Sequence, residues 1–219
     1  IRSSRLALCR RHFINYVGPF EKMKLRMLNG THSMLAYVGF HCGHRYVRDV
    51  MNDKVLSSLV NRHLQIAAQT LKPIKGIDYN NYAKSLILRF SNPEIAHETF
   101  QIAMDGSEKM QQRIFYPLKD AISLNLNIRP FAFAIAAWLR HISQSNHDCA
   151  PYELRDPIAD QLTPLPKERS AHSILDYLSR IGVLIDDLKE DKMFWGQVSD
   201  ILNDMLCKPM KSVVEQEII

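Results

Sequence analysis

The sequence predicts a mainly α-helical protein, and three observations carry this prediction. Apolar residues recur every three to four positions in most segments, which is the period of a helix with one buried face. Runs of alternating β-branched residues, which are typical of half-buried strands, are nearly absent. With 219 residues, of which 46% are hydrophobic, the chain is long enough to bury a sizeable core. We therefore expect about seven to nine helices.

The predicted helices follow from the periodicity and from the residues that begin and end helices. The first covers residues 19–41, because a proline suits the first helical position, where its missing N–H costs little. The second covers residues 45–71 and ends before Pro73 and Gly76. The remaining predicted helices cover 79–90, 93–104, 109–126, 129–142, 158–162, 170–180 and 191–205.

The segment RPFAFAIAAWLRHI, residues 129–142, is apolar nearly all round. A helix of that kind is buried on every side. We therefore expect this helix at the centre of the core. The polar stretch that follows it, SQSNHDCAPYELRDP, reads as a loop, and TPLPKERS reads as a turn marked by prolines.

Charge and cysteine content restrict the class of protein. The formal net charge is +5, from 28 basic and 23 acidic residues spread along the chain, and no basic stripe is interleaved with aromatic residues. This argues against a nucleic-acid-binding protein. The four cysteines lie far apart without a CxxC pair, and the sequence shows neither a signal peptide nor a long apolar run. We therefore expect a cytoplasmic protein with no membrane partner.

Lys24 stands among methionines and leucines in PFEKMKLRMLNGTHSMLAYVG. At about 100° per residue, it falls inside the apolar arc, whereas Lys22 and Arg26 project to the opposite side, where water would solvate them. An ammonium held against the protein loses hydration and exchanges its proton more readily near neutral pH. Asn29 and His32 would border the same pocket. The alternative is a lysine whose stem packs and whose head reaches water, and periodicity alone leaves both interpretations open.

Two further groups of polar residues are candidates for a site. In MDGSEKMQQR, the Asp-Gly-Ser turn is followed by a helix in which Ser107 would cap the first turn. Lys109 and Arg113 are four residues apart in that helix, so they form either a fork for substrate oxygens or ordinary surface charge. In FHCGHR, the side chains of His41, Cys42 and His44 are metal-capable, but no partner pair follows at a familiar spacing, so we expect no metal.

Four stretches together resemble the carboxy-terminal half of the polyol-specific long-chain dehydrogenases, a family that includes mannitol 2-dehydrogenase, fructuronate reductase and tagaturonate reductase. These stretches are PFEKMKLRMLNGTHSMLAYVG, RFSNPEIAHETFQIAMDGSEKMQQR, AIAAWLRHI and PYELRDPIADQL. The specific part is the K-x4-N-x2-H spacing in KLRMLNGTH. The resemblance implies that Lys24 is the catalytic acid and base, that Asn29 binds the carbonyl oxygen, and that His32 positions the substrate or the asparagine. It also places Lys109 and Arg113 beside the substrate.

The resemblance further implies a domain organisation. Family members carry an amino-terminal dinucleotide-binding Rossmann domain, whereas this sequence has no GxGxxG and no GxxxxGK[ST] motif. We therefore expect residues 1–18, whose first dozen match the family poorly, to lie at a domain boundary, and residues 19–219 to form the helical substrate domain. The cofactor would be NAD, with NADP left open, bound mainly by the missing domain. The isolated chain is then expected to bind NAD poorly and to be inactive.

The substrate implied by the resemblance is a small sugar acid or polyol. The DGSEK and YELRDP stretches look closer to the hexuronate reductases, so we expect metal-independent reduction of a ketouronate, of the fructuronate type, to an aldonate. Interconversion of fructose and mannitol is the second possibility. A non-catalytic helical interaction module is the alternative from another class of protein, and a basic nucleic-acid binder is the third reading.

Overall fold

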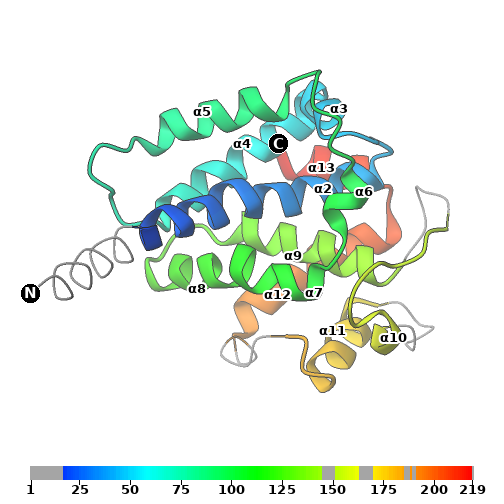
Figure 1. Cartoon of the computed structure of the whole chain (residues 1–219). Coiled ribbons are helices and arrows are strands. Elements are labelled where there is room, and N and C mark those ends of the chain that lie inside the picture. The colour runs from blue at the N-terminus through cyan, green and yellow to red at the C-terminus, as the bar shows by residue number, and fades with distance from the viewer. Residues whose placement is uncertain (1–16, 145–150, 163–169, 185–187, 189–190, 219) are drawn as a thin grey trace, which may run out of the picture.

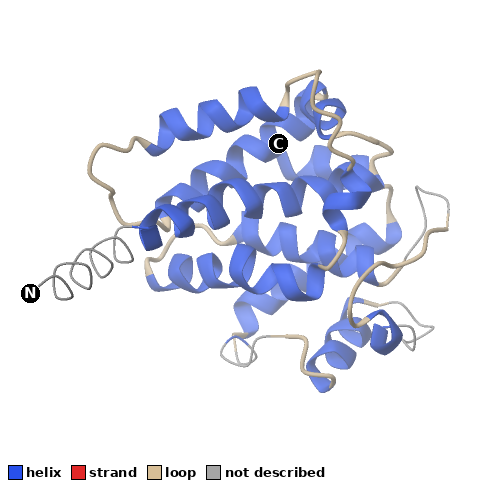
Figure 2. Ribbon diagram, viewed as in Figure 1, coloured by secondary structure: helices blue, strands red, loops and turns tan. Residues whose placement is uncertain are grey.

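The structure, a computed structural model, describes residues 17–144, 151–162, 170–184, 188 and 191–218. Over these ranges the chain forms helices and loops and no strand, as the sequence predicts (Figures 1 and 2). Residues 1–16, which hold most of the predicted boundary segment, and most of the TPLPKERS turn lie outside the described residues.

The centre of the fold is α9, Arg129–Ile142, which lies against α12 (Lys192–Cys207), α2 (Thr31–His41) and α4 (Lys54–Gln69). Every α9 residue after the first is buried. Figure 1 shows α9 between α2 and α12, with α4 beyond α2. The prediction that the apolar segment is the central helix is confirmed.

The first predicted helix runs continuously but not uniformly. Residues 17–23 are α-helical, η1 (Lys24–Gly30) is π-helical, and α2 continues to His41. A π-helix is hydrogen-bonded from residue i to residue i+5, so each turn holds more residues than an α-turn. The residues that follow η1 are therefore rotated about the axis relative to those that precede it.

Two of the predicted helices differ in extent from the helices of the structure, each for an identifiable reason. The helix expected over 45–71 is split into α3 (Val47–Asn52) and α4, because the carboxylate of Asp53 accepts the N–H groups of Val55 and Leu56 and caps a new helix there. The helix expected over 93–104 shrinks to α6 (Thr99–Ala103).

Backbone pairing explains the shortened α6. The carbonyl of His97 accepts the N–H of Val47 at 3.0 Å, and the N–H of Thr99 donates to the carbonyl of Arg45 at 2.9 Å. These bonds flank an antiparallel bridge between Tyr46 and Glu98. They occupy backbone groups that a helix over 93–98 would need for itself.

The other helices lie close to their predicted positions, with one addition. The helix expected over 109–126 begins earlier, and the terminal helix α13 was not expected. Their bounds are α5 (Tyr79–Phe90), α7 (Gly106–Met110), η2 (Gln111–Phe115), α8 (Tyr116–Ser123), α10 (Ala159–Leu162), α11 (Ala171–Arg180) and α13 (Met210–Ile218).

A buried carboxylate fastens α13 to the rest of the protein. The side chain of Glu217 is 2% exposed and lies 2.8 Å from Arg62 Nη2 of α4 and 2.7 Å from Arg129 Nη2 of α9. Arg62 also donates to the Glu217 carbonyl at 2.7 Å. Charge-assisted bonds of this kind offset the cost of burying the carboxylate. Neither arginine is near Glu217 in sequence, so periodicity could not indicate this anchor.

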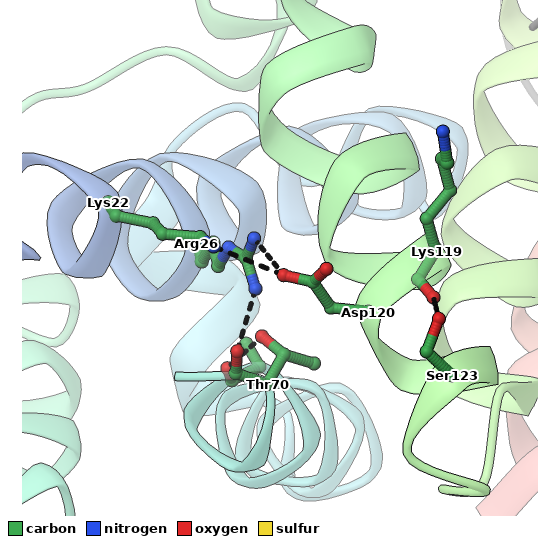
Figure 3. A network of polar contacts seen from close by, with 7 residues as sticks. Lys22, Arg26, Thr70, Lys119, Asp120 and Ser123 are labelled. Atoms are coloured by element: carbon green, nitrogen blue, oxygen red, sulfur yellow. Dashed lines mark hydrogen bonds and ion pairs between the residues drawn. The ribbon is translucent and has the colours of Figure 1, made fainter. Parts of the chain in front are cut away.

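Arg26 is the second buried ion-pair anchor, and its position corrects the sequence analysis. The residue is 3% exposed instead of solvated. Figure 3 shows its guanidinium between the Thr70 carbonyl, at 2.8 Å, and the Asp120 carboxylate, at 2.5 Å. Burial alone would raise the pKa of Asp120, but the hydrogen bonds from Arg26 and Lys22 outweigh burial and lower it. Arg26 therefore ties the first helix to the end of α4 and to α8.

None of the helices in the described ranges is long and apolar enough to cross a membrane. Cys42 and Cys207 form no disulfide in the described part of the chain, and Cys9 and Cys149 fall outside it.

We expect His63 to make stability depend on pH. The residue is 1% exposed, its ring lies 5.4 Å from that of Phe131, and burial lowers its pKa from 6.5 to about 4. Between these values the unfolded chain binds a proton that the folded chain does not, so the free energy of unfolding falls as pH falls through this window. His63→Leu should reduce that slope by up to about 1.4 kcal/mol per pH unit, measured by urea unfolding at several pH values.

His172 of α11 is exposed and provides the control. His172→Leu should show the same dependence of the free energy of unfolding on pH as the wild-type protein. An unchanged slope in His63→Leu would mean that His63 is protonated in the folded protein.

Candidate functional site

The structure places Lys24 differently from the sequence analysis. Lys24, the first residue of η1, is exposed, whereas Met23 and Met27 are buried. The expected apolar face was drawn with the same rotation of about 100° per residue along the whole helix. The rotation per residue is smaller in the π-helical turns of η1, so residues before and after η1 do not line up as expected. The interpretation that Lys24 packs against this chain is therefore wrong. Its ammonium is open to a ligand or to another part of the protein.

Asn29 and His32 follow Lys24 along the same helix, and both are half-buried. The His32 ring lies 4.5 Å from the Phe90 ring and 6.0 Å from the His97 ring, and its Nε2 is buried without a hydrogen-bond partner among the described residues. Burial lowers the pKa of His32 to about 4, and repulsion from His97, Arg113 and Arg89 acts in the same direction. The imidazole is therefore neutral near pH 7.

A glycine contact brings the second candidate segment to the first. A Cβ at Gly30 would lie 2.6 Å from the carbonyl oxygen of Arg113, so a side chain at position 30 does not fit. Through this close approach the π-helical segments η1 and η2 pack together. The Arg113 guanidinium then donates to Ser33 Oγ at 3.0 Å. The structure thus brings Arg113 to the turn that carries His32.

Arg113 and Lys109 have different surroundings. Burial lowers the pKa of Arg113, while Tyr37 and Asp105 oppose that effect; an arginine still keeps its charge in a protein. Lys109 Nζ lies 3.1 Å from Asp105 and donates to the Met104 carbonyl at 2.7 Å, so its charge is paired within its own turn. Lys109 and Arg113 therefore contact different groups, and the contacts of the structure do not support a fork formed by the two side chains.

The Asp-Gly-Ser turn is held by a distant loop. Asp105 takes the left-handed conformation, with φ of 56°, and precedes α7 as its N-cap residue. Ser107 lies inside α7 and is not the cap. Its N–H donates to Asp156 Oδ2 at 2.9 Å, and its hydroxyl donates to Asp156 Oδ1. Asp156, in the YELRDP stretch, therefore binds the start of α7, 49 residues away in the chain.

The turn requires glycine at position 106, because a side chain there would collide with two buried residues. A Cβ at Gly106 would lie 2.5 Å from both the Tyr37 hydroxyl oxygen and Trp138 Nε1. The turn therefore sits directly on α2 and α9, which fixes the position of η2 beside η1.

The FHCGHR residues belong to separate environments. His41 is buried, with its ring 5.3 Å from that of Phe40 and 5.6 Å from that of His141. His44 lies 3.9 Å from Asp53. Within the described ranges, no group of three or more histidine, cysteine, aspartate or glutamate side chains is placed to hold a metal.

The residues that surround His32 were not predicted from the sequence. Phe90, Arg89 and His97 all lie in RFSNPEIAHETF, which the resemblance covers, but their spacing has no helical or strand period that points to position 32. Only the packing of α5 and the following loop against α2 reveals the association.

Comparison with known proteins identifies relatives along most of the chain. The family model described as the mannitol dehydrogenase C-terminal domain matches residues 16–206. The chain is 36% identical to the D-mannonate oxidoreductase of Escherichia coli over 85% of its length, which is 39% of that protein. It is 33% identical to the mannitol 2-dehydrogenase of Aspergillus oryzae over 88% of its length, which is 38% of that protein.

A solved structure has the same fold. This structure is the Pseudomonas fluorescens mannitol 2-dehydrogenase, solved as a ternary complex with NAD and D-mannitol. The two structures superpose with a TM-score of 0.85 at 24% sequence identity, and the match covers 92% of this chain and 41% of the Pseudomonas chain. The chain therefore spans about two fifths of the length of the relatives that it matches.

We expect Gly30→Ala to separate η1 from η2. The methyl group would meet a backbone carbonyl, which cannot turn away as a side chain would, so the free energy of unfolding should fall by roughly 2 kcal/mol. Chemical denaturation measures this change.

Gly196→Ala in α12 is the matched control, because nothing lies within 4 Å of its Cβ position. That substitution should stabilise the protein by up to about 1 kcal/mol, since alanine favours a helix interior. Equal effects at positions 30 and 196 would contradict a close approach of Gly30 to Arg113.

Proposed function

The chain belongs to the mannitol dehydrogenase C-terminal domain family, and on this premise we propose that it is the substrate domain of an oxidoreductase that interconverts a ketouronate and an aldonate. An oxidoreductase of polyols or sugar acids is the class of its relatives. The choice of a sugar acid rests chiefly on Arg113. Its guanidinium is half-buried beside Ser33 and His32, and a planar fork of N–H donors suits a carboxylate.

In the proposed reaction Lys24 moves the proton. As an ammonium it donates to the carbonyl oxygen of the ketouronate during reduction, and as a neutral amine it accepts the hydroxyl proton of the aldonate during oxidation. The exposure of Lys24 supports this role, because a substrate can reach its amine. Desolvation of the ammonium would come from the bound substrate and from the part of the protein that carries the cofactor.

Asn29 and His32 would stabilise and orient the reacting oxygen. The Asn29 amide N–H donates to the oxygen on which negative charge develops. The neutral His32 ring binds a neighbouring substrate hydroxyl, or orients Asn29, through the buried Nε2 that has no partner in the described part of the chain. An uncharged imidazole serves here as either donor or acceptor.

The residues of this chain do not fit a dinucleotide site by themselves. The sequence has no glycine-rich phosphate loop, and the described ranges contain no strand from which such a loop starts. We propose that NAD, or NADP, binds to a Rossmann domain joined to this one, where its nicotinamide would carry the hydride. The isolated chain is then inactive, and no resident metal takes part.

A second candidate function is the interconversion of fructose and mannitol. The pairing of Lys109 with Asp105 favours this possibility, because it leaves one fewer positive charge for a carboxylate. Similarity to mannitol 2-dehydrogenases also agrees with it.

The test is reduction of fructuronate, tagaturonate and fructose by the gene product that carries this chain, with NADH and NADPH in parallel. We expect a ketouronate to be reduced, and Lys24→Ala to lower kcat by about a hundredfold or more. The variant should keep the stability of wild type, because Lys24 is exposed.

Lys22→Ala is the matched control, since Lys22 is an exposed cation two residues earlier in the same helix. It should retain kcat within about twofold. Reduction of fructose alone would support the second candidate. Full activity of Lys24→Ala would show that Lys24 is not the proton donor and acceptor. Absence of turnover with all three substrates would favour a non-catalytic helical module.

A further inference from the structure

Three cationic or protonatable side chains surround His32 from different elements. Arg89 comes from α5, His97 from the loop before α6, and Arg113 from η2. All three act on His32 in the direction that disfavours a positive charge on it. The groups whose charge acts on His32 include no carboxylate. A negatively charged ligand beside His32 would therefore be attracted by Arg89 and Arg113, and the His97 ring would offer it an N–H donor.

His97 is held in place by backbone bonds rather than by its side chain. Its carbonyl accepts the N–H of Val47, and the neighbouring Glu98 forms the antiparallel bridge to Tyr46. The side chain is nevertheless exposed, with its ring 6.0 Å from the His32 ring. A fixed main chain with an exposed, polar side chain is the arrangement that a binding residue needs.

Arg89 reaches the same place from the end of α5. It directly precedes Phe90, whose buried ring lies 4.5 Å from the His32 ring. Arg89 itself is exposed. Phe90 therefore fixes the spacing between α5 and His32 by packing, and Arg89 is the exposed residue next to it in the chain.

We propose that His97 and Arg89, acting together with Arg113, are specificity-determining residues that receive the carboxylate of a sugar acid beside His32 and so favour it over a neutral polyol. The inference rests on the proposed function. Arg89 supplies permanent positive charge, and His97 supplies an N–H donor that is charged when protonated. His32 is neutral near pH 7, so it places no charge of its own beside the carboxylate.

The test compares KM for fructuronate and for fructose in the gene product that carries this chain. His97→Asn and Arg89→Gln should each raise KM for fructuronate by about tenfold or more, since a charge-assisted bond is lost. KM for fructose should stay within about twofold, as should kcat for both substrates. His97→Lys should keep much of the preference for fructuronate, because lysine places a positive charge and N–H donors at that position.

Lys84→Gln is the control for Arg89→Gln, because Lys84 is an exposed cation of the same helix five residues earlier. It should behave as wild type. If His97→Asn and Arg89→Gln match Lys84→Gln, or raise KM equally for both substrates, the specificity role is overturned.

Calorimetric binding of D-mannonate and D-mannitol to the same variants separates this inference from the proposed function. Binding of mannonate that is lost in His97→Asn, in a protein that reduces no substrate, would overturn the proposed function and support the anion-binding residues. If the protein reduces ketouronates and both variants keep the wild-type KM, the proposed function is supported and the specificity role of His97 and Arg89 is overturned. Equal binding of mannonate and mannitol by wild type would overturn the specificity role.

Discussion

The close approach of the Gly30 backbone to the Arg113 carbonyl is the constraint on which the candidate site depends. A hydrogen atom fits at that point and a methyl group does not. The contact joins two π-helical segments that are distant in sequence, and single π-helical turns are frequent at functional sites. It places Arg113 against Ser33, one residue from His32. Without this contact, the lysine, asparagine and histidine of the first helix would stand apart from the cation of η2.

The chain uses its positive charges in two distinct ways. Arg26, and Arg62 with Arg129, meet buried or partly buried carboxylates and hold helices together. Lys24, Arg89 and Arg113 have no carboxylate partner among the ion pairs of the described residues. Because unpaired cations are costly in a core but useful to an anionic ligand, these three are found where the protein is exposed or half-exposed.

Much of the fold was predictable because it follows from local patterns. The bounds of α5 and α9 agree with the periodicity, and Asp78 marks the start of α5 by accepting the Asn80 N–H. The break at Asp53 and the loss of helix over 93–98 were not predictable from periodicity. Each depends on a competing partner for the backbone: a capping carboxylate at the first site, and the residues 45–47 at the second.

The sequence alone determined the helical class, the central position of the 129–142 helix, and the K-x4-N-x2-H spacing that carries the family resemblance, because each depends on residues close together in the chain. Only the tertiary structure decided which cations are buried. Lys24 and Arg26 exchange their expected environments, because the π-helical turns alter the rotation of the helix and because Thr70 and Asp120 offer Arg26 its partners. The surroundings of His32 likewise come from α5, η2 and a bridged loop, and contacts between such distant segments have no period in the sequence.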